Sequence, residues 1–196
     1  GGKSSQIAAD LGGAGVLVAN EYVPQRARIL DSNLERMGVK NAVITNNRPD
    51  SICEKLSGYF NKVLVDAPCS GEGMFRKEPN AKNEWSEKAV SDCAKRQAKI
   101  LDSAAKAVCA GGELVYSTCT FSPEENEIQI DDFLKRNPDF ELVDCAVSFG
   151  SVIPRGRLSI TADSEKMRRV FPFDGGEGHF AAKLKRISGG EYAADY

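Results

Sequence analysis

Short apolar runs alternate with helical patterns along almost the whole chain, and this alternation limits the possible folds more than any other feature. The apolar runs are 15–20, 41–46, 62–67, 113–119, 139–145 and 178–186. The segments with helical patterns are 5–12, 23–38, 50–58, 91–112 and 122–138. Strands that alternate with helices are typical of a mostly parallel sheet with helices on both faces. We therefore expect an α/β fold of the doubly wound type.

The pattern predicts one core domain, residues 1–187, followed by a polar tail or linker at 188–196. The first strand of a doubly wound sheet is expected upstream of Gly1 and is missing here. The chain is 41% hydrophobic with a formal charge of −2, which suits a globular core and argues against nucleic-acid binding by charge alone. No apolar run approaches the roughly 18 residues of a membrane span. We expect a cytoplasmic monomer with no membrane partner.

The cysteines divide into two groups. None of the six is spaced C-x-x-C and there is a single histidine, His179, so we expect free thiols and no metal site. Cys69 in "VLVDAPCSGEGMFRKEP" and Cys119 in "ELVYSTCTFSPEENE" lie in polar, turn-rich segments after strands. We expect His179 to be structural or peripheral. The other cysteines fit small buried hydrophobic positions: Cys53, Cys93, Cys109 and Cys145.

Polar clusters follow four of the expected strands, where a parallel sheet binds its ligands. If the strands ending at Asp66 and Ser117 are neighbours, Cys69 and Cys119 face one cleft. A thiolate is a strong nucleophile and needs only a modest pKa shift to form. At the start of the chain, "GGKSS" precedes a helix and can present N–H groups to a polar cofactor. Glu21, just past the next strand, suits a ribose hydroxyl, and together these suggest a nucleoside cofactor.

The segment 122–138 carries a strong signature of a helix start. Ser122 is expected to cap the helix, with Pro123 in its first position. Glu125, three residues after Ser122, is the acid of a capping box. These residues predict a helix that begins at Pro123.

The motifs "GGKSS", "DAPCSGEG" and "STCTFSPEENE" resemble those of the RNA cytosine-5 methyltransferases. This family includes bacterial 16S ribosomal RNA methyltransferases and the eukaryotic NOL1/NOP2/Sun proteins. The segments "FRKEP" and "GEGHF" resemble its ribosomal RNA branch, and the likeness runs from Gly1 to about Arg186. The resemblance implies a Rossmann-like methyltransferase fold, S-adenosyl-L-methionine as cofactor and RNA, most simply ribosomal RNA, as partner. It also implies that N- and C-terminal RNA-binding segments of the family are missing here.

The resemblance assigns a role to both thiols. The attacking thiol belongs to the "TC" motif, which gives Cys119, and its addition to C6 of cytosine makes C5 nucleophilic. Cys69 assists release of the methylated product. Asp66 would hydrogen-bond N3 of the base, and Lys3 resembles a family lysine near that carboxylate.

The resemblance also implies where cofactor and RNA are held. Arg76 and Lys77, just past the Cys69 loop, are placed to hold RNA phosphates. The target cytosine has to leave its stack to expose C6 to a thiolate. The asparagine pair of the "TNNRPD" loop would have to hold adenine, and either member can do so. The residues expected to line the cofactor site are Gly1, Gly2, Lys3, Ser4, Glu21, Arg26, Asn46, Asn47, Asp66 and Pro68.

Other functions remain open at this stage. A tRNA cytosine-5 methyltransferase would use the same chemistry on another RNA. A DNA-type enzyme would use the Pro-Cys dipeptide and make Cys69 the nucleophile, although its later motif would read Glu-Asn-Val. A redox protein would join Cys69 to Cys119 in a regulatory disulfide. A plain RNA-binding module is disfavoured by the acidic balance of the chain.

Overall fold

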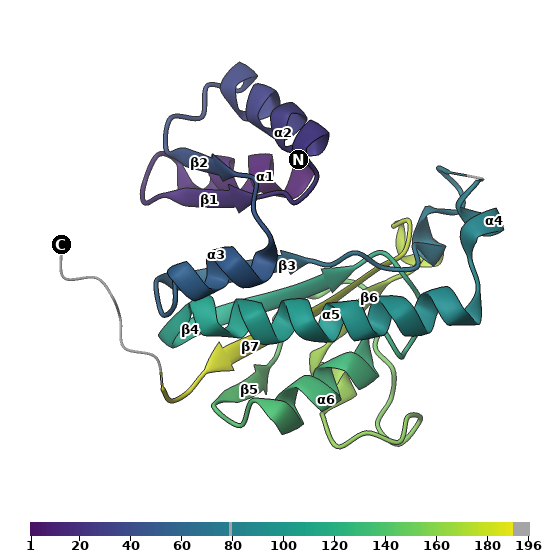
Figure 1. Ribbon diagram of the computed structural model, residues 1–196. Coiled ribbons are helices and arrows are strands. Elements are labelled where there is room, and N and C mark those ends of the chain that lie inside the picture. Colours follow the sequence, from purple (N-terminus) through teal and green to yellow (C-terminus); the bar gives the residue numbers. More distant parts are fainter. Residues whose placement is uncertain (79, 190–196) are drawn as a thin grey trace. The chain divides into compact units, whose positions relative to one another are not determined.

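The computed structural model describes residues 1–78 and 80–189 and divides the chain into two compact units (Figure 1). The first unit is Gly1–Ile52 and the second begins at Cys53. Most of the expected tail, 188–196, lies outside the described residues, and the expected single core of residues 1–187 stays a prediction.

The first unit is built from two βα pairs around a small core. Pro24 takes the first position of its helix, where its missing N–H is not needed, and the preceding Val23 is extended. Gly12 ends the first helix with φ 55°, a conformation that glycine adopts without strain. The two strands pair in parallel. The elements are α1 (Gly2–Leu11), β1 (Leu17–Asn20), α2 (Pro24–Arg36), β2 (Ala42–Thr45) and α3 (Pro49–Lys55), the last of which crosses into the second unit. The buried core residues are Ala8, Ala19, Leu30 and Leu34.

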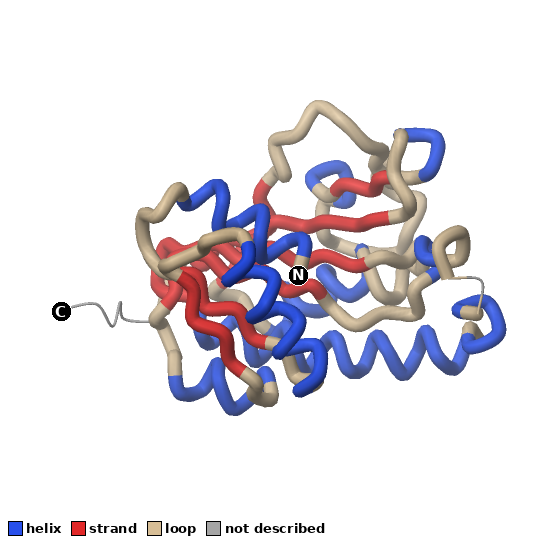
Figure 2. Tube along the Cα trace, turned by 90° about the horizontal axis from the view of Figure 1, so that it is seen from above, coloured by secondary structure: helices blue, strands red, loops and turns tan. Residues whose placement is uncertain are grey.

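The second unit contains a five-stranded sheet whose path is β3-β4-β7-β5, with β6 also paired to β7 (Figure 2). β3 and β4 pair in parallel, whereas β7 is antiparallel to β4, β5 and β6. The sheet is therefore mixed, which corrects the expectation of a mostly parallel sheet. The last strand reverses direction and enters between two strands that run the other way. The strands are β3 (Phe60–Asp66), β4 (Val108–Thr118), β5 (Phe140–Val143), β6 (Arg168–Val170) and β7 (His179–Arg186).

Two helices cover one side of this sheet. α5 packs against β3, β4 and α6, and α6 packs against β5. Ser86 starts α5 as a cap, because its side chain accepts a hydrogen bond from the Ala89 N–H. On the other side of β3, Leu64 stays 37% exposed, so the expected helix cover on both faces is not found at this strand of the second unit. The helices are η1 (Glu72–Met74), α4 (Ala81–Glu84), α5 (Glu87–Ala107), α6 (Glu127–Arg136), η2 (Ser164–Lys166) and η3 (Pro172–Asp174).

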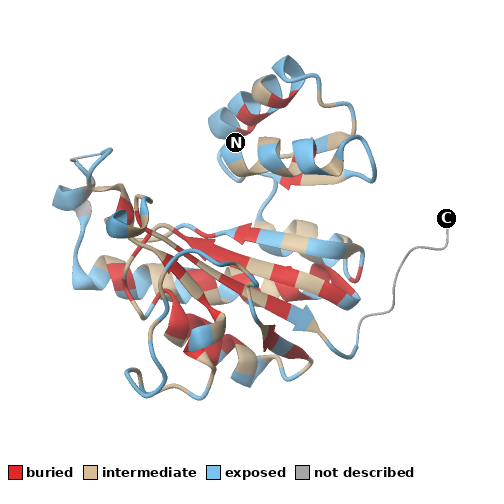
Figure 3. Ribbon diagram, turned by 180° about the vertical axis from the view of Figure 1, so that it is seen from behind, coloured by how far each residue is buried: buried red, intermediate tan, exposed pale blue. Residues whose placement is uncertain are grey.

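The buried core lies between these helices and the central strands (Figure 3). Tyr116, Leu114 and Leu184 are fully buried in β4 and β7, facing Leu101 of α5 and Phe133 of α6. This core makes the carboxyl ends of β3 and β4 a firm support for the segments that follow them. Within 1–78 and 80–189, no helix has both the length and the apolar character to cross a membrane.

The expected start of the last major helix is wrong. α6 begins at Glu127, and 123–126 form a turn instead. The Ser122 hydroxyl bonds the carboxylate of Glu124. The Glu125 side chain turns away from the helix start and into the protein, where it bonds Ser70.

Candidate active site

The two thiols singled out by the sequence lie side by side. β3 and β4 are neighbours, with Asp66 opposite Ser117 in the register, and the Ala67 N–H continues the ladder to the Ser117 carbonyl at 2.9 Å. The Sγ atoms of Cys69 and Cys119 are 3.1 Å apart, and the Cys119 N–H donates to Cys69 Sγ at 3.3 Å. Both cysteines are half-buried, and neither is joined in a disulfide. The expectation that these two loops meet is confirmed.

The contact between the two thiols favours the protonated form of Cys69. The hydrogen bond to the Cys119 thiol is the largest cause that raises the pKa of Cys69 well above its ordinary value, and burial adds to it. Backbone N–H bonds from Cys119 and Gly71 act in the opposite direction and do not reverse the shift. Cys69 therefore remains a thiol at neutral pH, able to donate its proton toward the neighbouring sulfur.

Glu125 braces the loop that carries Cys69. Its buried carboxylate accepts hydrogen bonds from the Ser70 N–H at 3.0 Å, the Ser70 hydroxyl at 2.5 Å and Gln97 Nε2 at 2.7 Å. Gln97 also donates to the Pro68 carbonyl at 2.9 Å. Burial raises the pKa of Glu125, and the bonds from Ser70 and Gln97 oppose this. Glu125 thus holds Ser70 directly, and it holds Pro68 through Gln97 of α5.

Glu72 forms the reciprocal brace on the loop that carries Cys119. One carboxylate oxygen accepts from the Thr120 hydroxyl at 3.1 Å and from the Phe121 N–H at 2.9 Å. The other accepts from the Trp85 indole N–H at 2.9 Å. The Gly73 N–H donates to the Cys119 carbonyl at 2.9 Å. Each cysteine loop therefore supplies the acid that fixes the other.

The close approach at Gly73 requires glycine. A Cβ there would lie 2.4 Å from the Gly178 carbonyl oxygen and 3.0 Å from that of Cys119.

The sequence interpretation missed both braces, because Glu72 was only part of a glycine-rich motif and Glu125 was assigned to a helix cap. The available signal was the presence of an acid inside each thiol motif.

The remaining expected residues of the second unit have different surroundings. Asp66 ends β3 and is exposed, as is Pro68. Arg76 and Lys77 each lie 3.9 Å from a carboxylate oxygen of Glu177. Their exposed fractions are 69% and 57%, against 27% for Glu177. The two cations thus have an internal counter-charge, which the sequence did not indicate, while still facing solvent.

In the first unit, α1 begins in the glycine motif. Gly1 is its N-cap and makes no side-chain cap bond. The amides of Gly2, Lys3 and Ser4 belong to the first turn of α1, where N–H groups have no partner within the helix. Apart from its chain neighbours and the backbone of its own helix, no heavy atom lies within 4 Å of the position where a Cβ of Gly2 would stand. This open helix start fits a polar or anionic cofactor group.

The segments after β1 and β2 are tied together. Glu21 accepts from the Val23 N–H at 2.9 Å and pairs with Arg26 at 3.3 Å. The Asn46 amide donates to the carbonyl of Glu21 at 2.6 Å, and the main chain of Asn47 bonds the side chain of Asn20. Asn46 therefore fixes the Glu21 loop through its amide nitrogen. That these residues form one site with the thiols stays a prediction.

Two further expectations concern a metal site and His179. The described residues contain no cluster of three or more His, Cys, Asp or Glu side chains able to hold a metal ion. His179 opens β7 and pairs with Val170 of β6 in the register. Its expected structural role stays a prediction.

Known proteins resemble the chain over almost its full length. The model of the family "16S rRNA methyltransferase RsmB/F" matches residues 1–185. The ribosomal RNA small subunit methyltransferase F of Shewanella piezotolerans is 42% identical over 193 residues, 96% of this chain and 39% of that protein. The protein of the same name from Escherichia coli is 38% identical over 191 residues, 95% of this chain and 38% of the relative. The chain thus spans about two fifths of the length of these curated relatives.

Solved structures also resemble the chain. The crystal structure of NSun6 from Pyrococcus horikoshii with SFG is 30% identical, with a TM-score of 0.81 over 96% of this chain and 46% of that one. A methyltransferase homolog protein from Pyrococcus horikoshii is 29% identical, with a TM-score of 0.80 over 95% of this chain and 58% of that one. The expected methyltransferase fold is confirmed. With a family model that matches nearly every residue, the chain belongs to the 16S rRNA methyltransferase RsmB/F family.

Proposed function

We propose that this chain is the catalytic part of an enzyme that methylates C5 of cytosine in ribosomal RNA, with S-adenosyl-L-methionine as cofactor. The observation that carries the proposal is the pair of thiols at the ends of β3 and β4, 3.1 Å apart. The family and the curated relatives named as ribosomal RNA methyltransferases support the substrate class.

The residues of the first unit fit the cofactor. The open start of α1 and the space beside Gly2 suit its polar groups, and Glu21 at the end of β1 suits its ribose. Arg26 and Asn46 hold Glu21 and its loop in place. When bound, the cofactor supplies an electrophilic methyl group.

Cys119 makes the cytosine reactive. Its thiolate adds to C6, forming the S–C6 bond. The electrons of the 5,6 double bond move into a C4–C5 double bond, and those of the C4–N3 double bond move to N3, which takes up a proton. Asp66, exposed at the end of β3, is placed to hydrogen-bond N3 and to support its protonation. The resulting enamine-like ring is nucleophilic at C5, where the methyl group is received.

Cys69 assists the reverse step. After C5 loses its proton to a base, the electrons of the C–H bond restore the 5,6 double bond and the S–C6 bond breaks. The electron pair returns to the Cys119 sulfur as a thiolate. The Cys69 thiol, which remains protonated and lies beside that sulfur, stabilises the departing thiolate by a hydrogen bond or a proton.

Two single substitutions in the full-length protein separate these roles. Cys119→Ala should abolish methyl transfer and form no covalent RNA complex. Cys69→Ala should add to the base, transfer the methyl group and then stall as an RNA adduct that survives denaturant. The half-buried Cys93, replaced by alanine, serves as the matched control and should methylate normally. The readouts are a denaturing gel with radiolabelled ribosomal RNA or tRNA fragments, and methyl incorporation measured in parallel.

The outcomes distinguish the alternatives. An inactive Cys69→Ala with a nearly unaffected Cys119→Ala would favour the DNA-type mechanism. Trapping by Cys119→Ala, rather than by Cys69→Ala, would overturn the assignment of the two roles. Absence of both adduct and methylation with every variant and every RNA, while the thiols oxidise readily, would favour a redox role. Faster methylation of tRNA than of ribosomal RNA would change the substrate but keep the chemistry.

A further inference from the structure

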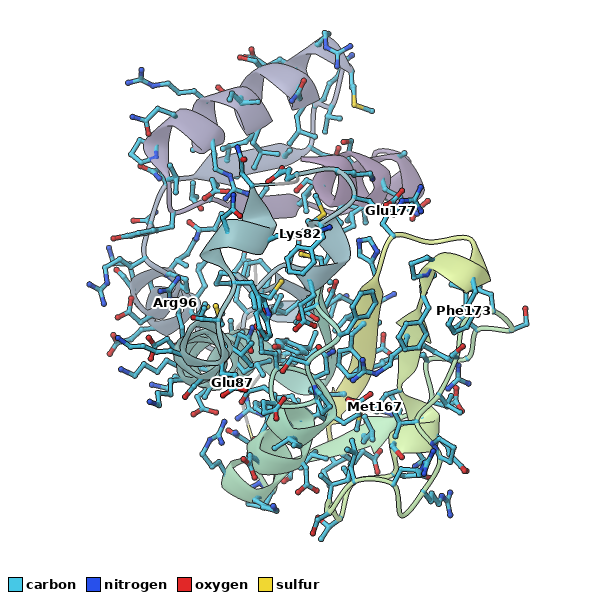
Figure 4. All side chains as sticks on the ribbon, turned by 90° about the vertical axis from the view of Figure 1, so that its right-hand side faces the viewer. Lys82, Glu87, Arg96, Met167, Phe173 and Glu177 are labelled. Atoms are coloured by element: carbon cyan, nitrogen blue, oxygen red, sulfur yellow. The ribbon has the colours of Figure 1, made fainter. Side chains whose placement is uncertain are left out.

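Three phenylalanine rings form a continuous stack from the Cys119 loop to the surface. Phe121, two residues after Cys119, stacks on Phe171 with ring centroids 5.4 Å apart and an interplanar angle of 16°. Phe171 stacks on Phe173 at 5.0 Å and 18°. Phe173 is 80% exposed, and Figure 4 labels it on the segment between β6 and β7.

The inner end of the stack is fixed to the active-site loops. The Phe121 N–H donates to Glu72, and its carbonyl accepts from Arg169 Nη1 at 2.8 Å. A Cβ at Gly178 would lie 2.5 Å from the Phe121 ring, so the loop before β7 presses directly on it. The position of Phe121 is therefore set by the same residues that set the Cys119 loop.

The outer end is fixed as well. The Phe171 N–H donates to Asp174 at 2.9 Å, and Asp174 also accepts from the Ser151 hydroxyl. The buried guanidinium of Arg169 lies 5.9 Å from the centre of the Phe171 ring. Phe173 is thus an exposed aromatic ring whose inner neighbours are fixed, and it is connected to the Cys119 loop through Phe171 and Phe121.

We propose that Phe173 is a stacking platform for an unpaired base of the substrate RNA, next to the cytosine that is methylated. The inference rests on the proposed function, because it takes the occupant to be a nucleobase. A rigid exposed ring suits any base, since every base has a π face. The solvent-facing cations Arg76 and Lys77 pair with Glu177, which lies on the same β6–β7 segment (Figure 4). Cations that face solvent suit the phosphates of an RNA strand.

The test uses the full-length protein and short ribosomal RNA fragments that carry the fluorescent base 2-aminopurine beside the target cytosine. Phe173→Ala and Phe173→Leu should raise KM for the RNA by roughly 10-fold, with kcat at saturating RNA near that of the unchanged protein. Phe173→Trp should restore KM, because its ring stacks. Phe149, itself 61% exposed, gives the matched control Phe149→Ala, which should leave KM unchanged.

Fluorescence gives an independent readout. Binding should quench 2-aminopurine in the unchanged protein and in Phe173→Trp, and much less in Phe173→Ala. Normal methylation with an unchanged KM in Phe173→Ala would overturn this inference and leave the proposed function intact. Equal KM values for leucine and phenylalanine would also overturn it, since stacking needs the ring. If the unchanged protein did not methylate, the proposed function would fail, and the quenching comparison would still decide whether Phe173 binds a base.

Discussion

Replacement of Arg169 by methionine should destabilise the second unit more than any loss of a surface ion pair. Arg169 is 3% exposed and its partner Glu127 1%, and two N–H groups of the guanidinium bond the two carboxylate oxygens. Removal of one partner from a buried pair costs about 3–5 kcal/mol, because the remaining charge stays buried without compensation. The Phe121 carbonyl would also lose its bond from Arg169.

The expected change is large enough for thermal unfolding. For a chain of this size, each kcal/mol shifts Tm by about 2–4 °C, so Arg169→Met should lower Tm by about 6–20 °C. Arg136→Met is the matched control, because its pair with Asp102 is 39% and 40% exposed. Such a pair contributes less than about 1 kcal/mol, and Tm should fall by no more than about 4 °C.

A double variant tests the reason for the loss. Arg169→Met with Glu127→Leu removes both charges, so no charge remains buried and most of the lost Tm should return. Part of the loss should persist, since the Phe121 carbonyl still lacks its donor. The reasoning is refuted if Arg169→Met and Arg136→Met shift Tm equally, or if the double variant is no more stable than Arg169→Met.

Three further substitutions test other features of the second unit. Burial alone would raise the pKa of Asp131, but hydrogen bonds from Lys135 and a neighbouring loop lower it to about 2. Because the folded state thus favours the charged carboxylate, Asp131 stabilises the fold above about pH 4. This contribution to stability is lost as the pH falls through about 2. Acid titrations of Tm should therefore show Asp131→Asn less stable at neutral pH and converging with the unchanged protein in acid, and a constant gap would contradict this. Gly73→Ala places a Cβ against the Gly178 carbonyl, so it should cost about 1–3 kcal/mol in denaturant unfolding and reduce methylation, whereas full activity and stability would show that the loops yield. Glu72→Gln cannot accept hydrogen bonds through both ends, so it should cost about 2 kcal/mol and slow methyl transfer; an unchanged kcat would remove this brace from the catalytic arrangement.

The sequence predicted the placement of the thiols on one condition, that the strands ending at Asp66 and Ser117 are neighbours, and the structure meets it. Each apolar run before a cysteine forms a strand, and both cysteines follow the carboxyl ends of their strands. Parallel neighbours bring such ends to one edge, so the pairing of Asp66 with Ser117 is enough to bring Cys69 beside Cys119. The direction of β7 could not be predicted in this way. An apolar run predicts a strand, but it does not indicate which strands will be its neighbours or whether it runs parallel to them. Its alternating burial is the signal of a half-buried antiparallel strand.

The misassigned role of Glu125 shows why the braces could not be read in the same way. A serine, a proline and an acid at capping-box spacing are a local signal, and their propensity favours a helix start by about 1 kcal/mol. The structure uses the acid for Ser70 and Gln97 instead, which are 55 and 28 residues away in sequence. Charge-assisted bonds of this kind contribute about 1.5–3 kcal/mol each, enough to outweigh the cap. The turn at 123–126 directs the Glu125 carboxylate toward Ser70 in the Cys69 loop. Because these bonds outweigh the cap, α6 begins at Glu127 and not at Pro123.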